Sequence, residues 1–278
     1  MKLSALRKHP KSFRRLTGLT VEKFDDLVEK VCPLFEAAEQ KRLSRPDRKR
    51  AIGGGRKYDL SVGEMLLLGV MYYRLYVSQA VLGILFEVSE STVSRRIGQM
   101  EPLLAAVFRI PSRRIQMTEE ELMEVFVDAT EQETERPKKG QRSWYSGKKK
   151  RHTIKHQIFV DRKGRIRAVS RAHKGKVNDK KVYAQEKVKV PPGVSQTGDK
   201  GSQGVAGMRT PFKKPRGGTL TKEQREHTRA LGKARIVVEH TLGKMKIFKI
   251  LSYRFRNPRN RHTLVFKNVA GLHNLMFA

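Results

Sequence analysis

Apolar residues recur at helical spacing near the start of the chain. One helix face is outlined by Val21, Phe24, Leu27, Val28 and Val31. Thr20 precedes this run, and its side-chain oxygen is suited to cap the first helical turn. We therefore expect a helical lead-in over residues 1–40. Residues 41–57 are basic and include three consecutive glycines, so we predict a mobile linker there.

A second helical pattern covers residues 61–108. A strongly apolar helix begins at Ser61, a shorter one covers 78–86, and a turn at 87–90 leads into a helix rich in Ser, Thr and Arg. This order is typical of a helix-turn-helix. The residues expected on its buried side are Leu82, Leu85, Val88, Val93 and Ile97. The residues expected to face a DNA major groove are Ser91, Thr92, Ser94, Arg95 and Arg96. An ordinary helical hairpin with a polar outer face is the alternative.

After a connector from Pro111 to Thr118, the pattern becomes mixed. Residues 125–127 predict a short buried strand that ends at Asp128. The elements predicted after it are strands over 152–160, 165–170 and, more weakly, 193–197, and helices over 178–189, 221–246 and 262–277. A hairpin turn at 161–164 joins the first two of these strands, and we expect a break in the long helix. The order predicts an α/β domain with a mixed sheet flanked by helices.

The net charge of the chain indicates the kind of molecule that it binds. Lys and Arg number 60 against 27 Asp and Glu, which gives a formal net charge of +33. Such a chain repels itself unless it meets a polyanion, so nucleic acid is the expected partner. A basic membrane-surface protein is disfavoured, because the basic residues lie throughout the chain and no strongly apolar amphipathic helix carries them. An RNA-binding, ribosome-associated protein remains an alternative on charge alone.

The remaining composition excludes several other classes. The single cysteine, Cys32, allows neither a disulfide within the chain nor a thiolate metal cluster. The basic N-terminus lacks the apolar core of a signal peptide, and no run approaches the roughly 18 apolar residues of a membrane span. The glycine-rich runs lack the setting of a P-loop, and the histidines do not follow a zinc-ligand pattern. We expect an internal protein without a small-molecule cofactor.

Acidic residues are scarce in the C-terminal half, where residues 137–278 hold 37 basic and 7 acidic residues. Two of the seven are Asp199, which follows a candidate strand, and Glu239, which lies in the long predicted helix. If they converged with Asp128, the three carboxylates would form an oxygen cage for Mg²⁺ or Mn²⁺. In phosphodiester cleavage, one such ion can activate the attacking water or 3′-hydroxyl while a second stabilises the leaving oxygen. Each acid also has a simpler interpretation: a strand-end Asp, a turn Asp before Gly201, and a Glu paired with Arg235 one helical turn away.

Basic residues crowd the predicted hairpin. They are Lys148, Lys149, Lys150, Arg151, Lys155, Arg162, Lys163, Arg165 and Arg167. We interpret them as a surface for the DNA backbone, where phosphate contacts position the nucleic acid without specifying its sequence. A solvated charged face is the alternative.

Five segments around the three acids carry a resemblance to a known family. They are Val127–Glu131 with Arg136-Pro137, Tyr145–Thr153, Gly198-Asp199-Lys200-Gly201, Pro211–Gly217 and Ala234–His240. In this order they resemble the IS5-type transposases, a group of the DDE superfamily that is also related to Harbinger elements. The resemblance covers roughly residues 120–278, and the helix-turn-helix before it matches the usual architecture of that group.

The resemblance implies an RNase H-like catalytic domain over 118–278, preceded by an all-α DNA-binding region over 1–117. It implies that Asp128, Asp199 and Glu239 are the catalytic acids and hold two Mg²⁺ or Mn²⁺ ions, with Arg235 contacting a phosphate or steadying the glutamate. It further implies DNA strand cleavage and transfer at the terminal inverted repeats of a mobile element. The implied partners are double-stranded DNA, both element ends and target, and a second copy of the chain in a homodimer on DNA. The implied setting is the nucleoid in the cytoplasm of a bacterial or archaeal host.

This sequence departs from the family pattern at three points. Asn178-Asp179 stands where similar proteins often have His-Asp, Ser202 stands where an aromatic residue often follows, and the strand before Asp199 is less apolar. The acid triad is retained. A non-catalytic, transposase-derived DNA-binding regulator is therefore the leading alternative to an active enzyme.

Overall fold

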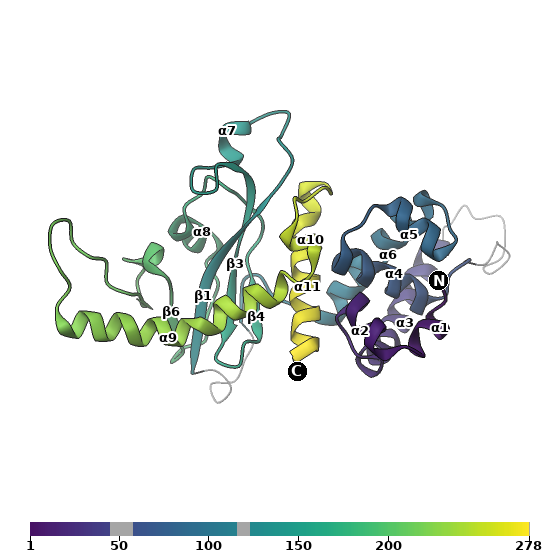
Figure 1. Cartoon of the computed structure of the whole chain (residues 1–278), viewed down its shortest axis with the longest axis horizontal. Helices are drawn as coiled ribbons and strands as arrows, with labels where there is room; N and C mark the ends of the chain where they lie inside the picture. The colour runs from purple at the N-terminus through teal and green to yellow at the C-terminus, as the bar shows by residue number, and fades with distance from the viewer. Residues whose placement is uncertain (45–57, 116–122, 278) are drawn as a thin grey trace. The chain divides into compact units, whose positions relative to one another are not determined.

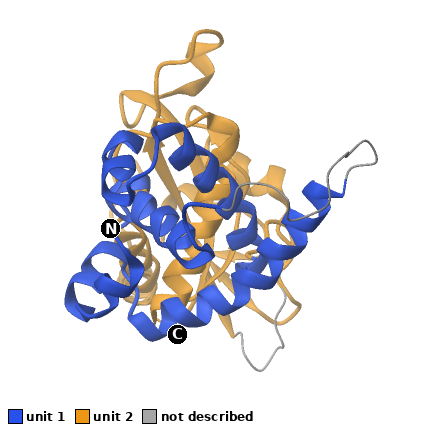
Figure 2. Ribbon diagram, turned by 90° about the vertical axis from the view of Figure 1, so that its right-hand side faces the viewer, with its two compact units in different colours: residues 1–109, 248–250 blue, residues 110–247, 251–278 orange. Residues whose placement is uncertain are grey.

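The computed structural model describes residues 1–44, 58–115 and 123–277. Most of the predicted linker at 41–57 and part of the connector at 111–118 lie outside these ranges. The chain forms two compact units (Figure 2). The first comprises Met1–Arg109 with Phe248–Ile250, and the second comprises Ile110–Ile247 with Leu251–Ala278. None of the helices in the described ranges combines the length and apolar character needed to span a membrane.

The first unit is helical, as the sequence predicts. Its helices are α1 (Leu3–Arg7), α2 (Pro10–Thr17), α3 (Val21–Leu43), α4 (Val62–Leu75), α5 (Gln79–Phe86) and α6 (Glu90–Phe108). The expected caps are present: the Thr20 side chain accepts a hydrogen bond from the Lys23 amide, and Ser61 forms a reciprocal capping box with Glu64. Most of α4 is buried at the centre of this unit.

The helix-turn-helix consists of α5, α6 and a tight turn at Glu87–Ser89. Glu87 takes a left-handed conformation, with φ 57°, and the Val88 amide donates to the Gly83 carbonyl at 2.9 Å. A Cβ at residue 83 would lie 2.7 Å from the Val88 carbonyl oxygen, so this approach requires glycine. One predicted core residue is wrong: Leu85 is 37% exposed, because it lies on the outer face of α5, whereas Leu82 is buried.

The second unit is built on a mixed sheet (Figure 1). Its strands are β1 (Glu124–Glu133), β2 (Tyr145–Ser146), β3 (Arg151–Asp161), β4 (Ile166–Val169), β5 (His173–Lys174), β6 (Ser195–Thr197) and β7 (Met208–Arg209). The order is β2-β3-β1-β6-β7, and β4 and β5 also pair with β3. β3 is antiparallel to β1 and β4, whereas β6 is parallel to both β1 and β7. This mixed sheet, flanked by helices, is consistent with the RNase H-like class that the resemblance implies.

The helical elements of the second unit are α7 (Gln141–Trp144), α8 (Asp179–Glu186), η2 (Lys200–Ser202), α9 (Lys222–Met245), η3 (Arg259–Arg261) and α11 (His262–Phe277), while α10 (Lys249–Ser252) crosses the boundary between the units. Three predictions need correction. β1 does not end at Asp128, because it stays paired with β3 as far as Glu133. α8 ends at Glu186, where Lys187 turns left-handed, with φ 47°. α9 has no break: a Thr221–Gln224 capping box starts it, and it continues to Met245.

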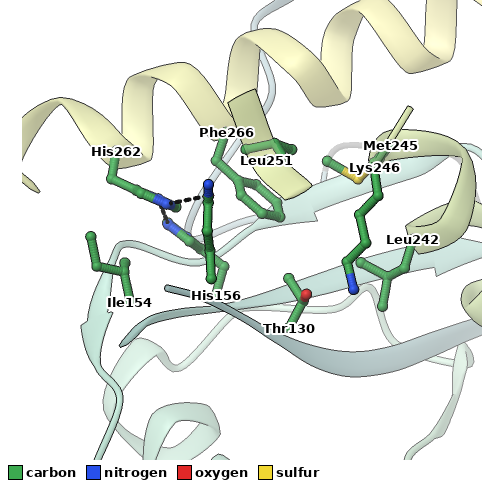
Figure 3. A pocket seen from close by; sticks show the side chains of 10 residues that line it. Thr130, Ile154, His156, Leu242, Met245, Lys246, Leu251, His262 and Phe266 are labelled. Atoms are coloured by element: carbon green, nitrogen blue, oxygen red, sulfur yellow. Dashed lines mark hydrogen bonds between the residues drawn. The ribbon is translucent and has the colours of Figure 1, made fainter. Parts of the chain in front are cut away.

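The two faces of the sheet are covered by different helices. On one face, Val125, Val127 and Phe159 form a core that Tyr183 of α8 joins. Because side chains alternate along a strand, the neighbours of these residues point to the other face. There His156 stacks on Phe266 of α11 and hydrogen-bonds His262, close to residues of α9 (Figure 3). Asp128 belongs to the alternation that includes Phe126 and Thr130, so it lies on the face that α9 crosses.

Candidate active site

Asp128 occupies the middle of β1, opposite Ile158 of β3. Its side chain is 20% exposed, and its Oδ1 lies 3.6 Å from Nη2 of Arg235, on α9. The amide of Ala129 donates to the same oxygen at 2.9 Å. Burial raises the pKa of the Asp128 carboxyl, Arg235 and the Ala129 amide oppose this rise, and the nearby carboxylates of Asp199 and Asp179 add to it.

The parallel pairing of β6 with β1 brings Asp199 toward Asp128. In this register Thr197 is opposite Phe126, and two further residues along each chain reach Asp199 and Asp128. β6 ends at Thr197 while β1 continues to Glu133, so Asp199 follows the end of β6 beside the middle of β1, next to Asp128. The repulsion of the Asp128 carboxylate by Asp199 agrees with this placement.

The glycines on either side of Asp199, Gly198 and Gly201, lie where a side chain would crowd its neighbours. Asp199 caps η2, and its Oδ1 accepts hydrogen bonds from the amide and the hydroxyl of Ser202, both at 3.0 Å. A Cβ at residue 201 would lie 3.1 Å from both carboxylate oxygens. A Cβ at residue 198 would lie 2.4 Å from the sulfur of Met208. The Gly198-Asp199-Lys200-Gly201 segment therefore fixes the aspartate against β7.

Glu239 lies on α9, one turn after Arg235, which is an advance of about 6 Å along the helix. Its side chain is exposed, whereas the neighbouring Val238 is fully buried. The ion pair that the sequence offers between Glu239 and Arg235 is replaced by the contact of Arg235 with Asp128. Within the described ranges, no three Asp, Glu, His or Cys side chains lie close enough together to share a metal ion. The fold thus brings two of the predicted acids together and leaves the third exposed on the helix above them.

The carboxylate oxygens of Asp128 and Asp199 suit a hard divalent cation. Carboxylate oxygens are the ligands that Mg²⁺ and Mn²⁺ prefer, and two adjacent carboxylates repel each other unless a cation neutralises them. Arg235 supplies part of that positive charge, and its buried Nε makes no hydrogen bond within the described chain. Asp128 and Asp199 therefore present a partly compensated negative site beside α9.

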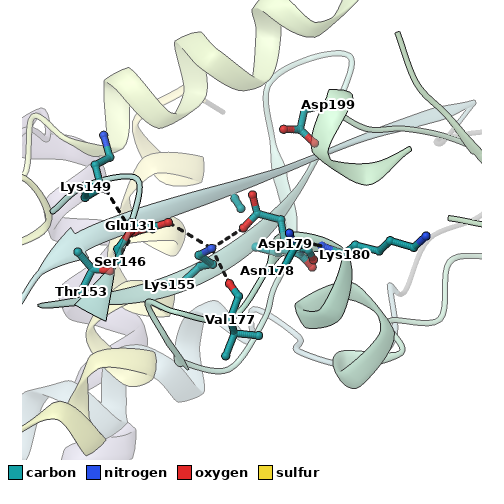
Figure 4. Close-up of polar contacts among 12 residues, drawn as sticks. Glu131, Ser146, Lys149, Thr153, Lys155, Val177, Asn178, Asp179, Lys180 and Asp199 are labelled. Atoms are coloured by element: carbon teal, nitrogen blue, oxygen red, sulfur yellow. Dashed lines mark hydrogen bonds and ion pairs between the residues drawn. The ribbon is translucent and has the colours of Figure 1, made fainter. Parts of the chain in front are cut away.

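A buried lysine beside this site was misassigned from the sequence. Lys155, interpreted as part of the DNA-backbone surface, is only 5% exposed. Its ammonium group donates to Asp179 at 2.6 Å and to the Val177 carbonyl at 2.7 Å, and lies 3.2 Å from Glu131 (Figure 4). The lysine therefore fixes the start of α8, where Asp179 follows the capping Asn178. The Asn178-Asp179 pair was noticed in the sequence only as a departure from the family pattern.

The other basic residues of the hairpin divide into two groups. Lys148, Lys149 and Lys150 are exposed, and Arg151 is exposed while it pairs with Glu133. Arg162 pairs with Glu124 at 3.1 Å, and Arg167 pairs with Asp161 at 2.6 Å. Lys163 and Arg165, between β3 and β4, are exposed like Lys148–Lys150, whereas Arg162 and Arg167 make ion pairs within the fold.

Helix α6 presents part of its predicted outer face. Ser91, Ser94 and Arg95 are exposed at its start. Thr92 is half-buried and bonds to the capping Ser89. Arg96 is half-buried too, with its guanidinium 4.2 Å from the ring centre of Tyr58.

Comparison with known proteins identifies the family. Residues 127–274 match the model of the DDE superfamily endonuclease, and residues 58–110 match the helix-turn-helix of the same superfamily. A relative from Microchaete diplosiphon, named "Probable transposase for insertion sequence element IS702", is 32% identical over 96% of this chain and 95% of its own. Another from Streptomyces albus G, named "Putative transposase for insertion sequence element IS112", is 28% identical over 81% of this chain and 84% of its own. No solved structure matches the chain. Endonucleases of this superfamily depend on divalent metal ions, and the chain belongs to the DDE superfamily of endonucleases, with that superfamily's helix-turn-helix domain.

Proposed function

We propose that this endonuclease is the transposase of an insertion sequence, of the IS5-type group. It binds the terminal inverted repeats of its element, cuts them and joins the freed 3′-hydroxyl to target DNA. The observation that carries the proposal is the parallel pairing of β6 with β1, which brings Asp199 beside Asp128, next to the helix that holds Glu239. The names of the two relatives and the five motif segments support it.

In this proposal Asp128, Asp199 and Glu239 hold two Mg²⁺ or Mn²⁺ ions. Bound there, the ions supply an activated water or 3′-hydroxyl and stabilise the leaving oxygen of the phosphodiester. The two aspartates provide a fixed base, since β1 and β6 hold their backbones in register. Glu239 completes the set from α9, and Arg235 positions Asp128 and balances its charge until the site is loaded.

The two regions divide the work in this proposal. Residues 1–117 recognise the ends through the exposed start of α6, where Ser91, Ser94 and Arg95 face the major groove. Residues 118–278 carry the chemistry, and Lys148–Arg151 hold the DNA backbone. Because transposition brings two ends together, we expect a homodimer on DNA. A DNA substrate of this kind locates the protein at the nucleoid in the cytoplasm.

A cleavage assay on DNA carrying the element ends tests the proposal. Asp128→Asn and Glu239→Gln should each lower Mg²⁺-dependent cutting by at least about 10³-fold, or about 4 kcal/mol, while DNA affinity is retained. Glu29→Gln is the matched control, because Glu29 is an exposed glutamate of α3 that has no assigned role in the acid site or in DNA contact. Normal cutting by both acid variants would refute the site assignment. Specific end binding without any cutting by the wild type would instead favour the regulator.

A further inference from the structure

A basic segment outside the predicted sites projects from the catalytic unit. We call residues 211–230 the arm: it comprises the loop after β7 and the first turns of α9. Figure 1 shows the loop leaving the sheet on the side of β6 and returning at the start of α9. The arm contains six basic residues and two glutamates, Glu223 and Glu226. Its net charge is therefore strongly positive over a short length of chain.

The arm presents its cations without internal partners. They are Lys213, Lys214 and Arg216 in the loop and Lys222, Arg225 and Arg229 in α9. All six are exposed, and none makes an ion pair or a side-chain hydrogen bond with the described residues. This contrasts with Arg162, Arg167 and Lys155, which pair with acids within the same unit. The arm's charge is thus available to an external polyanion.

The helical part of the arm has one charged side that the sheet does not cover. Lys222, Arg225 and Arg229 recur at i, i+3 and i+7, so they share one helix face, with Glu226 beside them. The first buried residue of α9 is Leu231, beyond the arm. A helix that is polar on all sides gains little from packing, and an exposed helix of this kind is suited to a charged partner.

The loop and the helix of the arm form one surface because side chains of the helix contact the loop directly. The amide of Phe212 donates to the hydroxyl of Thr228 at 3.2 Å, and the Phe212 ring packs edge-on against His227 with 5.3 Å between ring centres. These contacts hold the loop cations beside the helix cations. The same helix continues to Arg235, which contacts Asp128 at 3.6 Å, so a strand bound along the arm would approach the acid site.

We propose that the arm binds the DNA backbone as a second nucleic-acid surface, separate from the helix-turn-helix and from Lys148–Arg151. The inference rests on the proposed function only in naming DNA as the polyanion. Three or four phosphates contact the arm's cations, and these contacts carry no sequence preference, because they reach the backbone and not the base edges.

The salt dependence of DNA binding tests the role of the arm, and the test does not require the sequence of the element ends to be known. The probe is a 30-bp duplex of arbitrary sequence, followed by fluorescence anisotropy in EDTA over a range of KCl concentrations. The test variant combines Lys213→Gln, Lys214→Gln, Arg225→Gln and Arg229→Gln. The slope of log K against log[KCl] is negative, and each lost phosphate contact should reduce its magnitude by about 0.9 and, at 0.1 M KCl, weaken binding about eightfold. We expect the magnitude of the slope to fall by about 2 to 4.

A control with the same change in charge separates a local contact from a general effect. It combines Lys138→Gln, Lys139→Gln, Lys181→Gln and Lys187→Gln, four exposed lysines outside the arm, the helix-turn-helix and Lys148–Arg151, and without side-chain partners among the described residues. Its slope should change by less than about 1. Conversely, Glu223→Gln with Glu226→Gln should tighten binding, a gain that a damaged fold does not produce.

Several outcomes would overturn the proposal. One is a slope for the arm variant that equals that of the wild type or of the control. Another is an unchanged slope with an altered sedimentation coefficient, which would assign the arm to a second copy of the chain. The binding assay in EDTA does not measure cutting, so its result can refute the role of the arm without bearing on the acid site. Asp128→Asn should therefore keep the wild-type slope.

Discussion

Replacing Arg235 by glutamine removes the guanidinium that contacts Asp128 and leaves that carboxylate facing Asp199. The structure predicts that the metal-free protein loses stability and that a divalent cation restores it. The reason is that either the cation or the guanidinium can neutralise the negative charge of Asp128 beside Asp199. The substitution thus probes the acid site through folding, independently of DNA cleavage.

The size of the effect follows from the geometry. Two unit charges 3.6 Å apart attract by about 4–5 kcal/mol at an effective dielectric constant of about 20. Breaking one side of a buried ion pair costs about 3–5 kcal/mol. Asp128 keeps 20% of its side chain exposed, so part of the lost attraction is recovered by water. We expect Arg235→Gln to destabilise the metal-free protein by about 2–3 kcal/mol.

Urea unfolding in EDTA and in millimolar MgCl₂ or MnCl₂ measures this prediction. The difference between wild type and Arg235→Gln should fall from about 2–3 kcal/mol in EDTA to below about 1 kcal/mol with the metal, because ligand binding to the folded state stabilises it. Arg229→Gln is the matched control, since Arg229 is an exposed arginine of the same helix without a partner among the described residues. It should change stability by less than about 0.5 kcal/mol.

Two results would refute the reasoning. If the metal stabilised wild type and Arg235→Gln equally, the guanidinium would not compensate the charge of a cation site. If Asp128→Asn kept the full stabilisation by metal, the cation would bind elsewhere. Either result would remove the electrostatic basis for placing the metal between β1 and α9.

Two further predictions concern other parts of the fold. Gly83→Ala places a Cβ 2.7 Å from the Val88 carbonyl oxygen, so we expect a loss of at least about 2 kcal/mol in urea unfolding and weaker duplex binding; unchanged values would contradict the tight-turn argument. The pKa of His156 is lowered from 6.5 to about 4, mainly because the imidazole is buried. His156 is therefore protonated at a higher pH in the unfolded chain than in the folded chain. Stability is therefore complete above about pH 6.5 and falls as the pH approaches 4, by about 2 kcal/mol between pH 7 and pH 5 from this residue. His156→Gln should flatten the pH profile of unfolding, the exposed His240→Gln should not, and equal profiles for the two would count against the assignment.

The helices were predictable from the sequence because their signals are local. Thr20, Ser61 and Thr221 each cap the helix that the pattern places after them. A cap needs only a side chain and an amide three residues away, so no distant part of the chain decides the outcome. The hairpin at 161–164 was predictable for the same reason, since its turn closes between Asp161 and Gly164.

The full length of β1 was not predictable, because its second half is polar. The strand continues past Asp128 through Thr130, Glu131 and Gln132, residues that read as a loop in isolation. Their partners come from distant segments: Gln132 bonds to His262, and Glu131 meets Lys155. Lys155 was misassigned for the same reason, since a lysine in a basic run gives no local sign that it is buried.

In the acid site too, the features that local sequence determines were predictable, and the contacts that depend on distant segments were not. Asp128 and Asp199 follow apolar or strand-like segments, so their association with the sheet was open to sequence reasoning, and the parallel register makes them neighbours. Glu239 has no such constraint, because a helix fixes its backbone while its exposed side chain remains without a charged partner among the described residues. Arg235 takes the position against Asp128 since two adjacent aspartates require a positive charge. In the proposed site the third acid joins when a metal ion takes over this compensation of charge, so we expect assembly of the site to depend on metal rather than on the fold alone.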